Sequence, residues 1–262
     1  MFVHNPFAAL PASIPPIAKQ TYVAVMFLLV VCGTLFDLAH KGSASYFFRH
    51  RRAVSFGARR RVSTGEATAL AVETLVVSVL GAGEFCGMWR RITHILTMYG
   101  FVLYVVTTAV MVFAYPTAAA PGPAILSELW YLGALLVCVG GLWFWLLQRV
   151  DVAAEGHSPF RLVRADLFVV SLLASAAFAL IWGGVQAAGD HAWANAFFGL
   201  YLLSNTVLFG SVPWSKFAHM FYKPAAAFQR RIEHASGFRN NLPAPADRPV
   251  GFGSARRQPH NY

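Results

Sequence analysis

Cysteine and charge are both scarce in this chain of 262 residues. The three cysteines, Cys32, Cys86 and Cys138, form no CxxC pair, which argues against a zinc site, an iron–sulfur cluster or a disulfide framework. Charged residues make up only 12% of the chain, whereas 57% of its residues are hydrophobic and the mean hydropathy is +0.52. This composition excludes a disordered protein, a collagen and an ordinary soluble domain, and it is typical of an integral membrane protein.

Long apolar runs account for most of the chain. Four of them contain no Asp, Glu, Lys or Arg, and an earlier one carries only Asp37, at its end. About 20 apolar residues are needed to cross a bilayer. We therefore predict an all-α bundle of five membrane-spanning helices, at 22–38, 95–115, 129–147, 167–188 and 192–212. The first run has no small-residue cleavage site after a short core, so we interpret it as a retained span and not as a signal peptide.

The distribution of basic residues predicts the orientation of the bundle. With five spans, Lys19 is the only one of the 21 Lys and Arg residues on the same side as the N-terminal segment 1–21. Because basic loops remain in the cytoplasm, we predict an inner-membrane protein with its N-terminus outside and its C-terminus in the cytoplasm. The extramembrane regions are then a basic cytoplasmic loop, 40–93, and a cytoplasmic tail, 213–262.

An apolar stretch at 67–83, inside the basic loop, has two interpretations. It carries Glu73 in its middle and Gly81 and Gly83 at its end. A sixth span here would place basic groups on both sides of the membrane, against the rule that orients the other spans. We therefore predict a helix at the cytoplasmic interface, within a membrane domain that covers 22–212, and the alternative is a helix that enters the bilayer.

Two of the nine histidines lie at one predicted membrane depth on different helices. His94 stands at the cytoplasmic start of the second span, and His219 follows the fifth. A b-type haem in a helical bundle needs two such imidazoles, a small residue beside the ring and cations near the propionates. Gly100 provides the small residue, and the cations at this depth are Arg90, Arg91 and Lys216. The alternative is that both histidines are surface residues that bind lipid headgroups.

The segments around both histidines resemble a known family. Residues 89–94 read Trp-Arg-Arg-Ile-Thr-His, and residues 213–219 read Pro-Trp-Ser-Lys-Phe-Ala-His. The first motif leads to Gly-Phe at 100–101 and Thr-Thr at 107–108. In these motifs and in its five spans, the chain resembles the membrane cytochrome b family of the nitrate reductase gamma subunit and the heterodisulfide reductase membrane subunits. Within that family it most resembles the membrane anchors of dissimilatory adenylylsulfate reductase.

The resemblance implies one haem b on the cytoplasmic side, with His94 and His219 as axial ligands. The family's second haem uses histidines ten residues after the first ligand and eighteen before the last, where this chain has Tyr104 and Tyr201. Two phenols in place of two imidazoles favour the loss of that second haem. We therefore expect a single haem b.

The resemblance also implies a function in electron transfer. The protein would link a cytoplasmic oxidoreductase, such as adenylylsulfate reductase, to the membrane quinone pool, with the enzyme docked on the basic loop and tail. A quinone headgroup needs hydrogen-bonding side chains near the interface, and the candidates at this depth are Glu84, Trp89, Ser215 and Lys216.

Two other functional classes are alternatives to electron transfer. A haem-free membrane anchor for the same enzyme stays an alternative, whereas a small transporter is disfavoured because spans two to five hold no charged residue. Nucleic acid is not an expected partner, because basic residues in a membrane protein mostly set its orientation. We expect the polar residues inside the spans to form interhelical hydrogen bonds; they are Thr107, Thr108, Ser171, Ser175, Ser204, Asn205 and Thr206.

Overall fold

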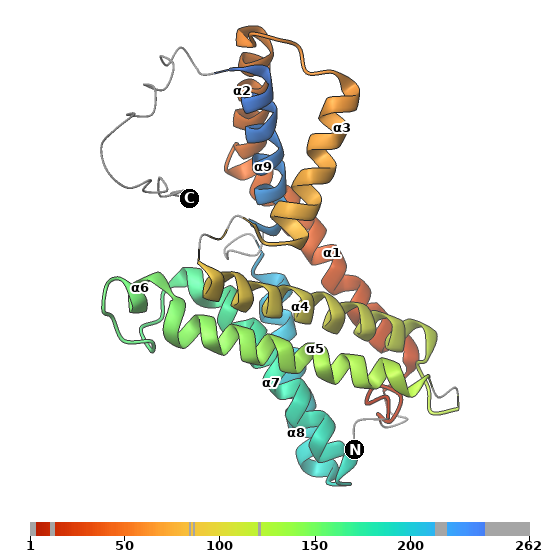
Figure 1. Ribbon diagram of the computed structural model, residues 1–262. Coiled ribbons are helices and arrows are strands. Elements are labelled where there is room, and N and C mark those ends of the chain that lie inside the picture. Colours follow the sequence, from red (N-terminus) through yellow and green to blue (C-terminus); the bar gives the residue numbers. More distant parts are fainter. Residues whose placement is uncertain are drawn as a thin grey trace. The chain divides into compact units, whose positions relative to one another are not determined.

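The computed structural model describes residues 4–10, 14–83, 85, 87–119, 122–212 and 219–238, and these residues form helices without a strand (Figure 1). Five helices are long and apolar enough to cross a membrane, which confirms the predicted all-α bundle of five spans. They are α1 (Pro16–His40), α4 (Met88–Ala114), α5 (Ala124–Trp143, continued by a π-helical turn at Phe144–Gln148), α7 (Leu167–Ala187) and α8 (His191–Gly210). A short helix α6 (Val150–Ala153) and a 3₁₀ turn (Arg164–Asp166) connect α5 to α7.

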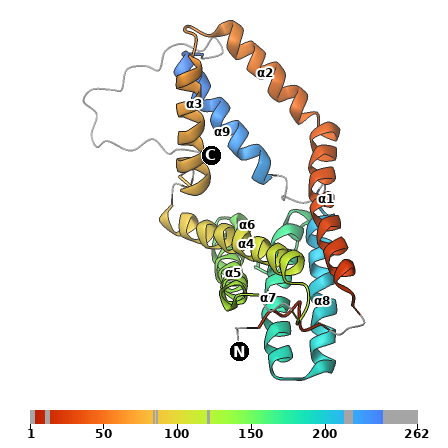
Figure 2. The same ribbon diagram turned by 90° about the vertical axis from the view of Figure 1, so that its right-hand side faces the viewer.

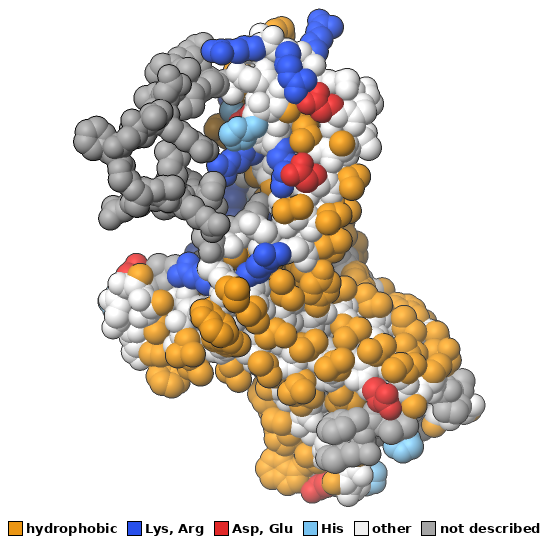
Figure 3. Space-filling model, in the orientation of Figure 1, with side chains coloured by type: hydrophobic (Ala, Val, Ile, Leu, Met, Phe, Trp, Pro, Cys, Tyr) orange, Lys and Arg blue, Asp and Glu red, His pale blue; other side chains and the backbone are white. Residues whose placement is uncertain are grey.

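The membrane helices belong to a first compact unit, which consists of Met1–Asp37 and Met88–Ala218. Within it, α4 packs beside α5, α7 packs beside α8, and α5 contacts α7 (Figure 1). Helix α1 is joined to α8 by the Tyr22 hydroxyl, which donates to the carbonyl of Leu202 over 2.9 Å. Large apolar side chains cover the outside of these helices (Figure 3). An apolar exterior is what a lipid-facing bundle requires, because lipid takes the place of water as the solvent.

The membrane helices extend beyond the apolar runs. Helix α4 begins at Met88, ahead of the predicted Ile95, so that Trp89, Arg90 and Arg91 all lie in its first turn. Basic and aromatic residues at a helix end can reach the membrane surface while their stems remain among lipid tails. For this reason an apolar run shows where a span crosses but not where its helix begins.

A second compact unit consists of Leu38–Gly87 and His219–Tyr262. Its helices are α2 (Ser43–Gly57), α3 (Thr64–Glu73, continued by a π-helical segment at Thr74–Leu80) and α9 (His219–Ser236). Figure 2 shows α9 between α2 and α3. Arg231 of α9 forms an ion pair with Glu73, and the Lys223 ammonium lies 5.6 Å from the centre of the Phe85 ring.

The sequence predicted one of these three helices. A helix at the stretch 67–83 is confirmed by α3 and its π-helical extension, and this segment is not among the five candidate spans of the described chain. Its position at the membrane interface stays a prediction. Helices α2 and α9 fall in regions for which the sequence predicted only a basic loop and a tail, and they pair with each other through His50 and Glu233.

Candidate functional site

The first predicted haem ligand, His94, lies near the start of α4 and is partly exposed. The preceding residue, Thr93, is buried, and its hydroxyl donates to the amide oxygen of Gln148 in α5 over 2.8 Å. Successive residues on an α-helix are about 100° apart around the axis. Because Thr93 faces α5, His94 lies to one side of the α4–α5 contact, on a helix whose rotation is fixed.

Gly100 is buried at one of the close contacts between α4 and α5. A Cβ atom at this position would lie 2.8 Å from Cβ of Leu136 and 2.9 Å from the carbonyl oxygen of Gly133. The contact is reciprocal, since a Cβ on Gly133 would lie 2.7 Å from the backbone nitrogen of Tyr104. Helix packing therefore explains why Gly100 has no side chain, and its predicted place beside a haem ring stays a prediction.

The other predicted ligand belongs to the second unit. His219 is the first residue of α9, but its side chain lies outside the described part of the structure, as do Lys216, Ser215 and Glu84. His94 lies in the first unit, so the pairing of the two imidazoles on one iron stays a prediction.

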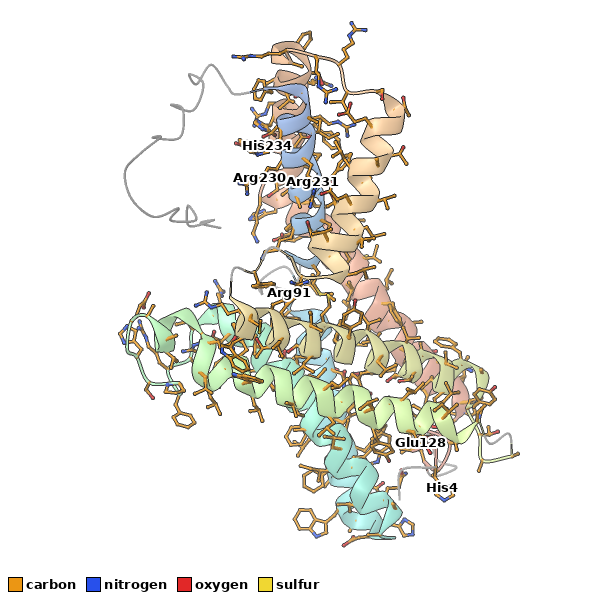
Figure 4. The ribbon with its side chains drawn as sticks, in the orientation of Figure 1. His4, Arg91, Glu128, Arg230, Arg231 and His234 are labelled. Atoms are coloured by element: carbon orange, nitrogen blue, oxygen red, sulfur yellow. The ribbon has the colours of Figure 1, made fainter. Side chains whose placement is uncertain are left out.

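Three further predicted residues lie in the first turn of α4. Arg90, Arg91 and Trp89 are all exposed, with Arg91 marked in Figure 4. The Trp89 ring lies 5.5 Å from that of Trp143 in α5, between ring centres. No acidic residue accompanies the two arginines in this turn. The positive end of the helix dipole disfavours two cations here, and a bound anion would offset that repulsion.

Tyr104 and Tyr201, the two tyrosines at the positions where the resemblance implies ligands of a second haem, are both buried. The Tyr104 hydroxyl lies 3.1 Å from Oγ of Ser175, and its ring stacks on Trp130 with 5.7 Å between centres. Tyr201 packs against Trp182, 5.4 Å away between ring centres. Both phenols are therefore part of a packed interior.

A residue from the N-terminal segment completes this interior. Phe7 is 4% exposed, and its ring meets those of Trp130 and Trp182 nearly edge-on, at 5.5 and 5.2 Å. The Lys19 ammonium donates to the carbonyl oxygens of Phe7 and Pro116, each over 2.7 Å. These two bonds tie the segment to α1 and to the connection between α4 and α5.

The cavity beside the two tyrosines has a volume of about 40 Å³. Tyr104, Tyr201 and Tyr22 line it together with Asn205. A space of this size is large enough for about one water molecule and cannot hold a macrocycle. Side chains therefore fill most of the space beside Tyr104 and Tyr201.

The expectation of interhelical hydrogen bonds is confirmed for some of the polar residues within the spans. Ser175 donates to Asn205 over 3.0 Å, and Thr108 accepts a hydrogen bond of 2.8 Å from the Trp130 indole. Thr206 bonds Tyr22 over 3.1 Å. The expectation is wrong for three residues that bond carbonyl groups of their own helices, namely Thr107, Ser171 and Ser204.

A buried ion pair at the far end of α5 was missed by the sequence analysis. Nη1 of Arg149 lies 2.9 Å from Oδ2 of Asp166, and the guanidinium also stacks 4.3 Å from the centre of the Trp145 ring. Arg149 lies two residues after one apolar run, and Asp166 directly precedes the next. Opposite charges at the facing ends of two consecutive spans were the signal available in the sequence.

Comparison with known proteins gives one similarity of note. Among curated proteins, the chain is similar to citrate utilization protein B of Escherichia coli, with 28% identity over 239 residues. The match covers 85% of this chain, and the chain spans 61% of the length of that relative. No protein-family model matches the chain, and no solved structure matches it. The findings place this chain among multi-pass membrane proteins with five candidate spans and with a similarity to citrate utilization protein B.

Proposed function

We propose that the protein is an electron-transfer subunit that anchors a cytoplasmic oxidoreductase to the inner membrane. Electrons pass between that enzyme and the quinone pool through one haem b, which His94 and His219 hold. The observation that carries this proposal is the presence of both histidines in their family motifs, at 89–94 and 213–219. An imidazole on each side of the iron gives the low-spin, six-coordinate haem that suits electron transfer.

The packing around Tyr104 and Tyr201 supports a single haem. These phenols and their aromatic neighbours fill the bundle at the family's second ligand positions, and only about 40 Å³ is left beside them. The exposed cations Arg90 and Arg91 at the start of α4 support a haem at the other ligand pair, because propionates would relieve their repulsion by the helix dipole.

The identity of the soluble partner has two candidates. The resemblance of the two motifs favours adenylylsulfate reductase, from which electrons would flow to quinone when sulfite is oxidised. The similarity to citrate utilization protein B favours an enzyme that acts on citrate or a related carboxylic acid. Either partner would use the same haem and the same docking surface. Copurification of the protein with one candidate enzyme and not with the other would identify the partner.

The test is a reduced-minus-oxidised spectrum of the purified protein, with a pyridine haemochrome assay for haem stoichiometry. We expect one haem b per chain in the wild type and none in His94→Ala or His219→Ala, with each variant still inserted in the membrane. His191→Ala is the matched control, because this exposed histidine at the start of α8 lies outside both motifs. A folded preparation that takes up no haem would instead support the haem-free anchor.

A further inference from the structure

A cavity of about 430 Å³ lies in the second unit, between α2 and α9. The spacing of its residues shows that one face of each helix lines it: Tyr46 and His50 on α2, and Arg230, Glu233 and His234 on α9. Its volume is within the range of about 300–1,000 Å³ that is usual for ligand sites. The cavity is therefore large enough for a ligand with several heavy atoms.

Phe238, which follows the end of α9, also lines the cavity. Its ring lies against Gly57, where a Cβ atom would be 2.7 Å from the ring, and its centre is 6.2 Å from that of His50. The backbone nitrogen of Arg59 donates to the carbonyl of Ser236 over 3.0 Å. These contacts hold the C-terminal ends of α2 and α9 together, so the shape of the cavity is set by the fold of the unit.

Basic side chains outnumber acidic ones around the cavity. Nε2 of His50 lies 2.7 Å from Oε1 of Glu233, and the amide of Gln229 donates to the same oxygen over 3.2 Å. The one carboxylate at the cavity is thus engaged. Arg230 and His234 are exposed at its rim (Figure 4), and neither side chain has a hydrogen bond or an ion pair with another described residue. An anion is the complement of this arrangement.

We propose that this cavity binds the phosphate group of an acidic phospholipid. Arginine presents a planar fork of donors that matches two phosphate oxygens, and basic pockets beside membrane spans bind phosphorylated headgroups. Helix α2 begins at Ser43, three residues after α1 ends at His40, so Tyr46 lies close to a membrane boundary along the chain. The exposed Tyr46 ring, stacked on His50, suits the interfacial region of a bilayer.

The test uses the full-length protein in nanodiscs of phosphatidylcholine with a minor fraction of phosphatidylglycerol, followed by native mass spectrometry of the lipid that stays bound. We expect the wild type to retain phosphatidylglycerol in preference to phosphatidylcholine. Arg230→Gln combined with His234→Gln should bind it roughly tenfold more weakly or worse, since charge-assisted hydrogen bonds are lost. The matched control is Arg51→Gln with Arg52→Gln, which removes two exposed cations of α2 that do not line the cavity. Equal retention by the cavity variant and the wild type overturns the proposal.

Two further measurements separate folding from binding and lipid from soluble phosphate. Arg230→Lys with His234→Lys places a lysine ammonium at both positions and should retain phosphatidylglycerol; loss of the lipid in this variant with an unchanged helical circular dichroism spectrum overturns the charge argument. Glycerol 3-phosphate should not displace the lipid. If it binds the detergent-solubilised wild type but not the glutamine variant, the cavity takes soluble phosphate esters and the lipid assignment is overturned.

Discussion

The hydroxyl of Tyr104 on α4 lies 3.1 Å from Oγ of Ser175 on α7. This contact crosses the interior of the bundle. Tyr104 stands at a position where the resemblance described above implies a haem ligand. Ser175 in turn donates to Asn205 of α8, so three helices are joined by one short series of polar side chains. The hydrogen-bonded phenol of Tyr104 contributes to the packing of the bundle. Removal of its hydroxyl should therefore lower the stability of the protein and leave its haem content unchanged.

Replacement of Tyr104 by Phe should lower the free energy of unfolding by about 0.5–1.5 kcal/mol, the usual range for an interhelical hydrogen bond in a membrane protein. Unfolding in mixed micelles measures this change. Haem content should stay at one per chain in Tyr104→Phe and in Tyr201→Phe. Tyr115→Phe is the control, because the Tyr115 hydroxyl bonds no described residue. A wild type with two haems per chain would contradict the packing argument.

Gly100→Ala should destabilise the bundle by about 1–3 kcal/mol, the usual cost of overpacking. The added methyl group would meet the backbone of α5, at the carbonyl oxygen of Gly133, and cannot be accommodated by a side-chain rotation. Thermal unfolding of the purified protein measures the effect. Gly199→Ala is the matched helical control, since a Cβ there has no neighbouring atom within 4 Å. Similar melting temperatures for the two variants would count against a tight contact between α4 and α5.

Arg149→Ala should cost about 3–5 kcal/mol, because it leaves the buried Asp166 carboxylate without its cation. Arg149→Met combined with Asp166→Leu removes both charges and should restore most of the lost stability. The coupling is measured by equilibrium unfolding of Arg149→Met, Asp166→Leu and the variant that combines these two substitutions. An additive double variant would show that the two side chains are not coupled.

Reporter fusions test the predicted orientation. A fusion at Gly57, after α2, should report the cytoplasm, and a fusion at Ala119, between α4 and α5, should report the outside. The reason is the concentration of Lys and Arg in the loop 40–93 and its absence from the loop after α4. A cytoplasmic signal at Ala119 would reverse the orientation of α4 and make a crossing helix of the stretch 67–83.

Charge reversal of Arg59 and Arg61 should slow association of the soluble partner enzyme, with a weaker dependence on salt than in the wild type. Arg60 is less suitable for this test, because its guanidinium is paired with Glu66 and its hydrogen bond lowers the pKa of that carboxyl. Surface plasmon resonance at several salt concentrations gives the rates. An unchanged salt dependence would place the docking surface elsewhere.

The five spans could be predicted from the sequence because lipid selects side chains by composition alone, and four of the runs carry no charge. Helix α2 could not be predicted. Its aromatic residues at 46–48 are followed by three arginines and one histidine at 49–52, and this segment shows no clear apolar period. Helix α9 contains Pro224, which usually ends a helix. Helix α2 pairs with α9 through His50 and Glu233, and α9 pairs with α3 through Arg231 and Glu73; such tertiary contacts leave little trace in local sequence.

Some residues of the candidate site could likewise be predicted from the sequence, and others could not. His94 and His219 could be proposed from motifs, and Tyr104 and Tyr201 from their departure from the motifs. Gly100 was predicted only as the small residue beside a haem ring, and its contact with α5 was not predicted, because a missing side chain does not show what lies against it. Opposite charges at the ends of two consecutive spans were a signal for the pairing of Arg149 with Asp166, but whether the two side chains meet depends on how the connection between α5 and α7 folds.

Under the proposed function, the packing of Phe7 against Trp130 and Trp182, held by the two hydrogen bonds of Lys19, would have an energetic consequence for the cell. Side chains fill the bundle at this end, and the one proposed haem lies at the opposite end. Electrons would then have no second redox centre on the way to the outer surface. Quinone would then be reduced, and its protons taken up, on the face where the enzyme docks. Turnover of such a complex would move no net charge across the bilayer and would feed the quinone pool without itself building a membrane potential.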